Sequence, residues 1–200
     1  MAAAPPSPKP SSPPEPALVN AAGQSLPAAL SGWGFSWQGW RSNARGEWWL
    51  LAQAVLILLN ALPATPAPSS LGLSWPLALQ LIGWGCFGLG LLLALQGFLG
   101  LGASLSPLPE PKPGAALITA GPYRRCRHPL YQAVLVCGLG VTLALGSLLH
   151  LGLLIALALV LRGKARREES RLLALHPEYG AYRARTPAIV PRFAGLDWRC

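Results

Sequence analysis

Residues 130–161 read LYQAVLVCGLGVTLALGSLLHLGLLIALALVL, an apolar run without a single Asp, Glu, Lys or Arg. A membrane-spanning helix needs about 17–25 residues, so this run is too long for one straight span and short for two full ones. Gly146 and Ser147 lie near its middle, where they favour a turn. The run therefore predicts a tight helical hairpin whose two arms reach, or nearly reach, the far side of a membrane.

Two further apolar runs precede the hairpin. Residues 48–62 are near the lower length limit for a span, whereas residues 75–105 are uncharged and long enough to cross a hydrocarbon core of about 30 Å. Beyond the hairpin, the stretch from Lys164 to Leu175 has the charge spacing and apolar edge of an amphipathic helix. We therefore predict an all-α integral membrane protein with about four transmembrane helices, the last two a tight hairpin, and a C-terminal cytoplasmic amphipathic helix.

The charge distribution predicts a topology. Hydrophobic residues make up 52% of the chain and charged residues only 12%, about half the soluble average of ~25%, which excludes a typical soluble enzyme. All 16 Lys and Arg residues lie in residues 1–47, 106–129 or 162–200. The positive-inside rule then places both termini and the 106–129 loop in the cytoplasm, and we expect a multi-pass protein of a bacterial inner membrane or another internal membrane. The net charge of +9 is explained by this topology and by anionic lipid head groups, so the bilayer is the predicted partner and no nucleic-acid-binding module is expected.

The remaining segments of the chain complete the predicted domain organisation. Residues 1–30 are rich in Pro, Ser and Ala and are predicted to be a disordered tail. Residues 31–47 crowd tryptophans into a segment typical of a membrane interface, with an aromatic cage for a ligand as the alternative. The first two transmembrane helices are placed within residues 48–105, and residues 106–200 hold the hairpin and the candidate site.

Two motif-like features predict no site. GWGCFG, residues 83–88, spells GxGxxG, but no strand precedes it, so its glycines are expected to pack against another helix rather than to bind a dinucleotide. The cysteines at 86, 126, 137 and 200 have no ligand-like spacing, so we predict neither a disulfide framework nor a metal site.

Nearly all candidate chemistry lies in two basic segments. The first is GPYRRCRHPLY, residues 121–131, at the mouth of the hairpin, and the second is RREE, residues 166–169, at its exit. Because a hairpin returns to the side that it left, these segments are expected to be neighbours. Together they offer cations, a histidine, tyrosines, paired carboxylates and a helix start at Pro129 with free N–H groups for an anion. The combination suits a zwitterionic ligand.

This ordered set resembles the isoprenylcysteine carboxyl methyltransferase family and its phospholipid N-methyltransferase relatives. The resemblance extends from Gly114 to Phe193 and includes LITAGPYRRCRHPLY, a membrane hairpin, REE, HPEYGAY and a closing IVP. It implies an integral-membrane methyltransferase that uses S-adenosyl-L-methionine. The implied acceptor is lipidic or prenyl-like, methylated at a carboxyl oxygen or at an amine nitrogen, and the oligomeric state stays open.

The resemblance also implies which residues act. One of the paired glutamates would give the cofactor a polar contact, and an arginine shortly before them would contact the acceptor. Cofactor contacts are implied for Ala115, Ala116, Leu117, Ile118, Tyr123, His128, Pro129, Leu130, Tyr131, Glu168 and Glu169. Catalytic roles are implied for Arg166, with Arg162 as its alternative, and for Glu168, which with Tyr131 would matter most for an amine acceptor that must lose a proton. Ala115 replaces a histidine of the family, and the spacing from the glutamates to Tyr179 is about one residue short.

Two other functions remain alternatives. Membrane reductases of the sterol-reductase type, which use NADPH, carry a similar RHP-x-Y turn. A non-catalytic membrane protein would use its basic ends to bind anionic lipid or a partner. The glutamate pair followed by EYGAY favours the methyltransferase.

Overall fold

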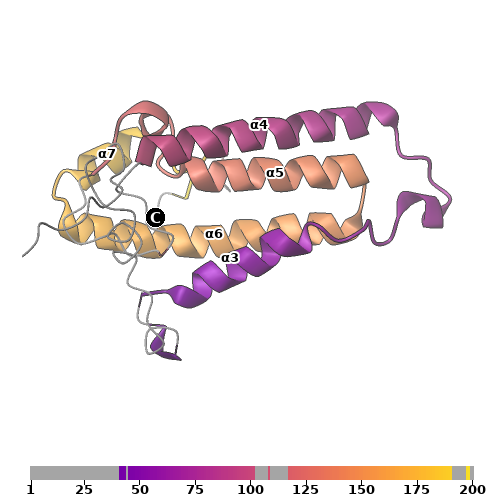
Figure 1. Ribbon diagram of the computed structural model, residues 1–200. Coiled ribbons are helices and arrows are strands. Elements are labelled where there is room, and N and C mark those ends of the chain that lie inside the picture. Colours follow the sequence, from indigo (N-terminus) through magenta and orange to yellow (C-terminus); the bar gives the residue numbers. More distant parts are fainter. Residues whose placement is uncertain (1–40, 44, 102–107, 109–116, 191–196, 199–200) are drawn as a thin grey trace, which may run out of the picture. The chain divides into compact units, whose positions relative to one another are not determined.

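The computed structural model describes residues 41–43, 45–101, 108, 117–190 and 197–198, all of which lie in one compact unit, Trp33–Cys200 (Figure 1). Every regular element among these residues is helical, as the all-α prediction requires. Their order is α3 (Glu47–Leu59), η1 (Pro68–Leu71), α4 (Leu77–Leu101), η3 (Gly121–Arg124), α5 (Pro129–Leu145), α6 (Leu148–Leu175) and α7 (Tyr179–Arg185), where η marks a short 3-10 turn. The predicted tail, residues 1–30, and most of the predicted interfacial segment 31–47 lie outside the described residues.

The structure contains the predicted helical hairpin. Helix α5 ends at Leu145 and is capped by Gly146, whose φ of 59° is left-handed, and α6 begins directly after Ser147. The Ser147 hydroxyl exchanges hydrogen bonds of 2.9 and 3.0 Å with the backbone of Thr65. The indole N–H of Trp75 donates to the carbonyl of Leu143 across 2.7 Å. The loop between α3 and α4 therefore holds the hairpin turn in place.

The chain after the turn differs from the prediction. Helix α6 runs without a break from Leu148 to Leu175, so the amphipathic helix predicted from Lys164 is its last part rather than a separate element. No proline interrupts this stretch, and its one glycine after Leu161, Gly163, costs a helix only about 1 kcal/mol. The surrounding Ala, Arg and Glu residues are strong helix formers. The charged residues are thus carried on a rigid extension of the second hairpin arm.

Two of the described helices, α4 and α6, are long and apolar enough to cross a membrane. Helices α3, with 13 residues, and α5, with 17, are shorter than or at the lower limit of a full span, which is about 17 residues. The count of four transmembrane helices, the cytoplasmic location of the termini and the domain boundaries therefore stay predictions.

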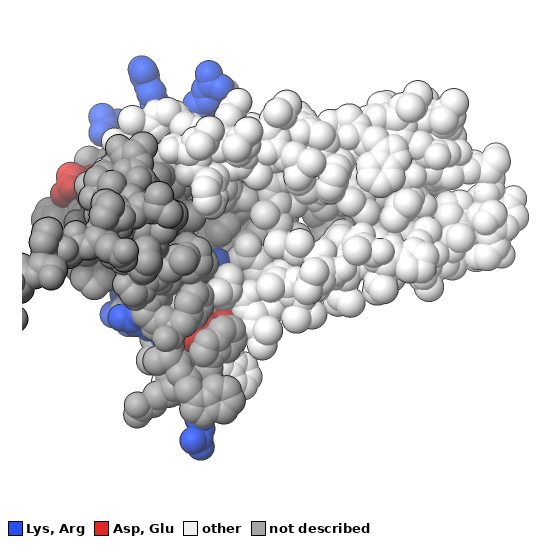
Figure 2. All heavy atoms as spheres, in the orientation of Figure 1, with Lys and Arg blue, Asp and Glu red and all other residues white. Residues whose placement is uncertain are grey.

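The surface of α4 suits contact with lipid. Its large side chains Leu81, Leu92 and Leu99 are 64%, 59% and 71% exposed, and exposed apolar surface on this scale is unusual for a protein surrounded by water. Figure 2 shows the Lys, Arg, Asp and Glu side chains gathered toward one end of the visible face, with uncharged residues over the rest of its described surface. The charged end is the one where α6 approaches α7.

A glycine seam, Gly83, Gly90 and Gly97, joins α4 to α5. These three are the buried residues of α4, and a spacing of seven places them along one side of the helix. A Cβ atom on Gly83 would lie 2.3 Å from the backbone nitrogen of Ala144, and one on Gly90 would lie 2.5 Å from the sulfur of Cys137. The two antiparallel helices (Figure 1) approach so closely because no side chains stand between them, as is common for helices packed in membranes.

The prediction that the glycines of the GxGxxG stretch pack against another helix is confirmed for Gly83 but not for Gly85 or Gly88. A Cβ atom on Gly85 would meet no described atom within 4 Å. We therefore expect Gly83→Ala to lower the free energy of unfolding by about 1–3 kcal/mol, because α4 must move away from α5 to make room. Gly85→Ala is the matched control and should be neutral or stabilising by up to about 1 kcal/mol. Thermal unfolding of both variants in the same detergent measures the difference, and equal melting temperatures would contradict the seam.

Candidate functional site

The two basic segments, residues 121–131 and 166–169, are neighbours, as the hairpin predicts. The chain after α7 holds the segment 121–131 in place. The backbone N–H groups of Arg127 and His128 donate to the carbonyls of Pro187 and Ala188 across 2.9 and 3.1 Å. The buried Cys126 thiol also donates to the carbonyl of Ala188, across 2.8 Å, and burial raises its pKa to about 11. The thiol is therefore neutral at pH 7, and the segment before α5 is held by three hydrogen bonds.

Glu169 is the centre of a buried ion cluster. Its Oε1 accepts from Arg127 Nε at 2.8 Å and lies 2.9 Å from His128 Nε2. Its Oε2 lies 3.4 Å from Nε of Arg183 on α7. The side chains of Arg127, His128 and Glu169 are 0%, 5% and 7% exposed. One carboxylate thus joins the start of α5, the charged half of α6 and α7, and its two oxygens are already engaged by protein groups.

Glu168 has a different environment from its neighbour. Its Oε2 accepts from the Tyr131 hydroxyl across 2.8 Å and lies 3.8 Å from His128 Nδ1, while its side chain is 30% exposed. The rings of His128 and Tyr131 stack with centroids 5.0 Å apart and planes 3° from parallel. Glu168 is therefore a preorganised carboxylate that a ligand can still reach. The sequence left open which glutamate of the pair serves a ligand, and this geometry favours Glu168.

Lys164 is a member of the site that the sequence analysis did not select. Its side chain is buried, its Nζ donates to Gln53 Oε1 of α3 across 2.8 Å, and it lies 5.3 Å from the centroid of the Tyr131 ring. Lys164 precedes Glu168 by one helical turn, so both face α5. That spacing was visible in the sequence, but the fact that this face of α6 is the buried one was not.

The two predicted arginines lie elsewhere on α6. Arg166 is exposed and, at two residues from both Lys164 and Glu168, lies on the opposite side of the helix. Arg162 is partly buried, and its Nε has no hydrogen-bond partner among the described residues. Of the cations before the glutamate pair, Lys164 is the one that the structure places against Tyr131.

Three buried tyrosines, Tyr123, Tyr179 and Tyr182, lie near the ion cluster of Glu169. The Tyr182 hydroxyl donates a short hydrogen bond to the carbonyl of Tyr123, and the rings of Tyr179 and Tyr182 pack edge to face with centroids 5.8 Å apart. Burial raises the pKa of all three hydroxyls, so each stays neutral at physiological pH. Each of these hydroxyls interacts electrostatically with Glu168 or Glu169, so the three neutral tyrosines lie close to the glutamate pair.

The remaining predicted cofactor residues are only partly described. Residues 115–116 lie outside the described residues, and Leu117 and Ile118 are partly buried at the start of the next described segment. Pro129 is the first residue of α5 and is buried. Leu130 packs against α4, because a Cβ atom on Gly97 would lie 3.0 Å from its side chain.

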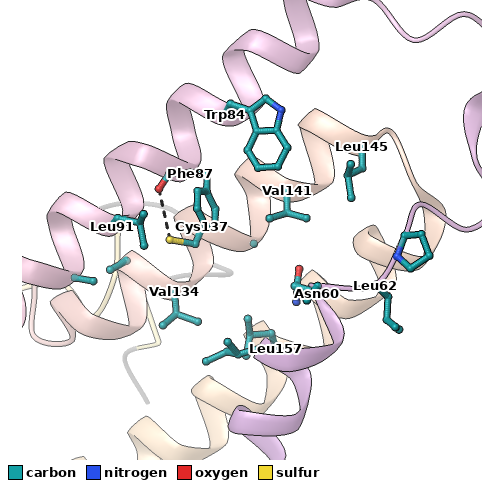
Figure 3. A pocket seen from close by; sticks show the side chains of 16 residues that line it. Asn60, Leu62, Trp84, Phe87, Leu91, Val134, Cys137, Val141, Leu145 and Leu157 are labelled. Carbon is teal, nitrogen blue, oxygen red and sulfur yellow. Dashed lines mark hydrogen bonds between the residues drawn. The ribbon is translucent and has the colours of Figure 1, made fainter.

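A large apolar cavity lies beyond the polar cluster, between α3, α4, α5 and α6. Its volume is about 620 Å³. Trp84, Phe87 and Leu91 of α4 and Val134 and Val141 of α5 line it (Figure 3). In α5, Val134 and Val141 follow Tyr131 by three and ten residues, so the cluster and the cavity share one side of that helix. The described residues contain no group of three or more His, Cys, Asp or Glu side chains placed to hold a metal ion.

This part of the chain is similar to known proteins. Residues 79–177 match the family model of the phospholipid methyltransferases. The cobalt-zinc-cadmium resistance protein CzcN of Cupriavidus metallidurans is 42% identical over 83 residues, and the nickel-cobalt-cadmium resistance protein NccN of Alcaligenes xylosoxydans xylosoxydans is 42% identical over 82. Each alignment covers 39% of this chain and 37% of the relative, so the match spans little more than a third of these relatives' length.

The matched family region contains all but the first two residues of α4, together with the hairpin, His128, Lys164 and both glutamates. The resemblance inferred from the RHPLY and REE segments is thereby confirmed at the level of the family. Through residues 79–177, the chain belongs to the phospholipid methyltransferase family.

Proposed function

We propose that this protein is an integral-membrane methyltransferase that transfers the methyl group of S-adenosyl-L-methionine to a lipophilic acceptor. The observation that carries the proposal is the Glu168–Tyr131–His128 cluster, in which Glu168 is partly exposed, on the side of α5 whose following turns line an apolar cavity. A polar, zwitterionic cofactor suits the cluster, and a lipid-soluble acceptor suits the cavity.

The residues of the cluster fit the polar parts of this cofactor. The partly exposed carboxylate of Glu168 would receive the ammonium group or the ribose hydroxyls, as an acceptor-only group does. The first turn of α5 begins with Pro129, and the N–H groups at this helix start would hold the carboxylate of the cofactor, while His128 orients the neighbouring Tyr131 and Glu168. The cofactor supplies an electrophilic methyl group on a sulfonium sulfur, and the chain supplies position and exclusion of water.

Lys164 supports an acceptor whose reacting end is an anion. It is a buried cation beside Tyr131, one turn from Glu168 and on the side of α6 that leads to Leu157 in the cavity wall. A carboxylate acceptor reacts as the anion and becomes a neutral ester, so no general base is needed. An amine acceptor must lose a proton, and Glu168 is the accessible carboxylate that would accept it.

Substitutions of the two glutamates should have different effects, one on cofactor binding and the other on stability. Glu168→Gln should weaken binding of S-adenosyl-L-methionine about 10- to 100-fold, because it removes a charge from a ligand contact worth about 1.5–3 kcal/mol, while the melting temperature stays near that of the wild type. Glu169→Gln should instead destabilise the fold by several kcal/mol, because Arg127 loses its buried partner. Calorimetric titration and thermal unfolding of both variants measure this. An unchanged titration for Glu168→Gln would overturn its assignment.

Lys164 and Arg166 provide a second matched pair. We expect Lys164→Met, which keeps the aliphatic stem, to reduce methyl transfer into a total lipid extract about 10-fold or more without changing cofactor affinity. Arg166→Met, two residues away on the exposed side of α6, should leave the transfer rate within about twofold of the wild type, the scatter expected of a surface substitution. The assay follows radioactivity from methyl-labelled cofactor. Loss of transfer in Arg166→Met with retention in Lys164→Met would favour the arginine predicted from the sequence.

A further inference from the structure

We propose that the apolar cavity binds a single lipid chain that carries a hydroxyl group, and that Asn60 recognises this hydroxyl. The inference rests on the proposed function only in identifying the chain as the methyl acceptor. The binding itself follows from the cavity and from Asn60.

The Asn60 amide presents a hydrogen-bond acceptor to the cavity. Its Nδ2 donates to the carbonyl of Leu56 across 2.8 Å, and because a carbonyl only accepts, this end of the amide must be the NH₂ group. The opposite end, Oδ1, is buried, and no group in the described part of the chain donates to it. Figure 3 shows the amide oxygen pointing into the cavity toward Val141. A buried acceptor without a donor costs about 1–3 kcal/mol, which a ligand hydroxyl would recover.

The remaining lining selects a hydroxyl over an amide N–H. Asn60, Cys137 and Trp84 are the lining residues whose side chains carry polar atoms. The Cys137 thiol is directed at the Phe87 carbonyl, 3.7 Å away, and Figure 3 shows the Trp84 nitrogen at the edge of the indole ring that faces away from Asn60. An amide N–H would bring its own carbonyl into the cavity, where that carbonyl would need a further donor. A hydroxyl can donate to Asn60 and leave no obligatory acceptor unpaired.

The size of the cavity fits one chain. An engineered cavity of about 150 Å³ holds one benzene molecule, so about 620 Å³ accommodates on the order of 20 carbon atoms. Along α5 the lining runs from Ala133 to Leu145, which is about 18 Å at 1.5 Å per residue. The lining residues Trp84 and Leu91 are 52% and 53% exposed, so a chain can enter the cavity from the side of α4.

The helices also set where the hydroxyl should lie. Gln53, the partner of Lys164, precedes Asn60 by seven residues on the same side of α3, a distance of about 10 Å along the helix. With the head of the chain at Lys164, about eight bonds of an extended chain at about 1.2 Å each span this distance, which brings the ninth or tenth carbon beside Asn60. The expected ligand is thus a long-chain carboxylate with a mid-chain hydroxyl.

Binding of a matched pair of fatty acids tests this proposal. The probes are 10-hydroxyoctadecanoic acid and octadecanoic acid, which differ by one hydroxyl, titrated into the purified full-length protein in detergent without cofactor. We expect the wild type to bind the hydroxy acid about 3- to 10-fold more tightly, the value of one net hydrogen bond. Asn60→Leu, which keeps the volume and removes the acceptor, should abolish or reverse this preference.

Gln80→Leu is the control variant. The Gln80 amide donates to the carbonyl of Trp75 across 3.1 Å, much as Asn60 does to Leu56, but Gln80 is not among the residues that line the cavity. It should keep the wild-type preference. Equal affinity of the wild type for the two probes, a preference that survives in Asn60→Leu, or no saturable binding of either probe would overturn the proposal. A preserved preference without any methyl transfer would instead remove the proposed function and leave the lipid site.

Discussion

The carboxylate of Glu169 is the group on which the geometry of the site depends. It is buried between Arg127, His128 and Arg183, and a buried charge of this kind is tolerated only when its partners are in place. Because these partners come from the segment before α5 and from α7, the single contact fixes both relative to α6. The same contact orients the His128 ring, which stacks on Tyr131 and in turn positions the hydroxyl that binds Glu168. The two adjacent glutamates therefore have different environments: Glu169 joins three segments of the fold, and Glu168 is the one that the proposed function assigns to the ligand.

Polar and apolar residues follow each other along the inner sides of the helices. Gln53, Tyr131 and Lys164 form a polar layer, and the cavity begins within a turn or two of it on the same sides of α3, α5 and α6. The glycine seam lies next to the cavity, because Ala133 and Cys137 of α5 both contact α4 at Gly90 and line the cavity. In the proposed function, a charged cofactor and an apolar acceptor meet at this layer, each in an environment of its own polarity.

The sequence predicts those features of the fold and of the site that depend on a local pattern of residues. An uncharged run with Gly146-Ser147 at its middle was sufficient to place the hairpin turn, since a turn residue with left-handed φ and the length of the arms are local properties. Topology alone then brought RHPLY and RREE together. The parts that it missed depend on helix phase and on tertiary contacts. Which side of α6 is buried separates Lys164 from Arg166 and Glu169 from Glu168, and the cavity at Asn60 is formed by four helices at once.

Methyl transfer itself is the central claim, and one measurement tests it most directly. The purified protein is incubated with methyl-labelled S-adenosyl-L-methionine and a total lipid extract, and the labelled product in the organic phase is identified by mass spectrometry. We predict a single-chain lipid product whose mass has increased by one methylene and whose formation requires the protein. Absence of label in the lipid phase above a protein-free control, under conditions where cofactor binding is saturated, would contradict the account.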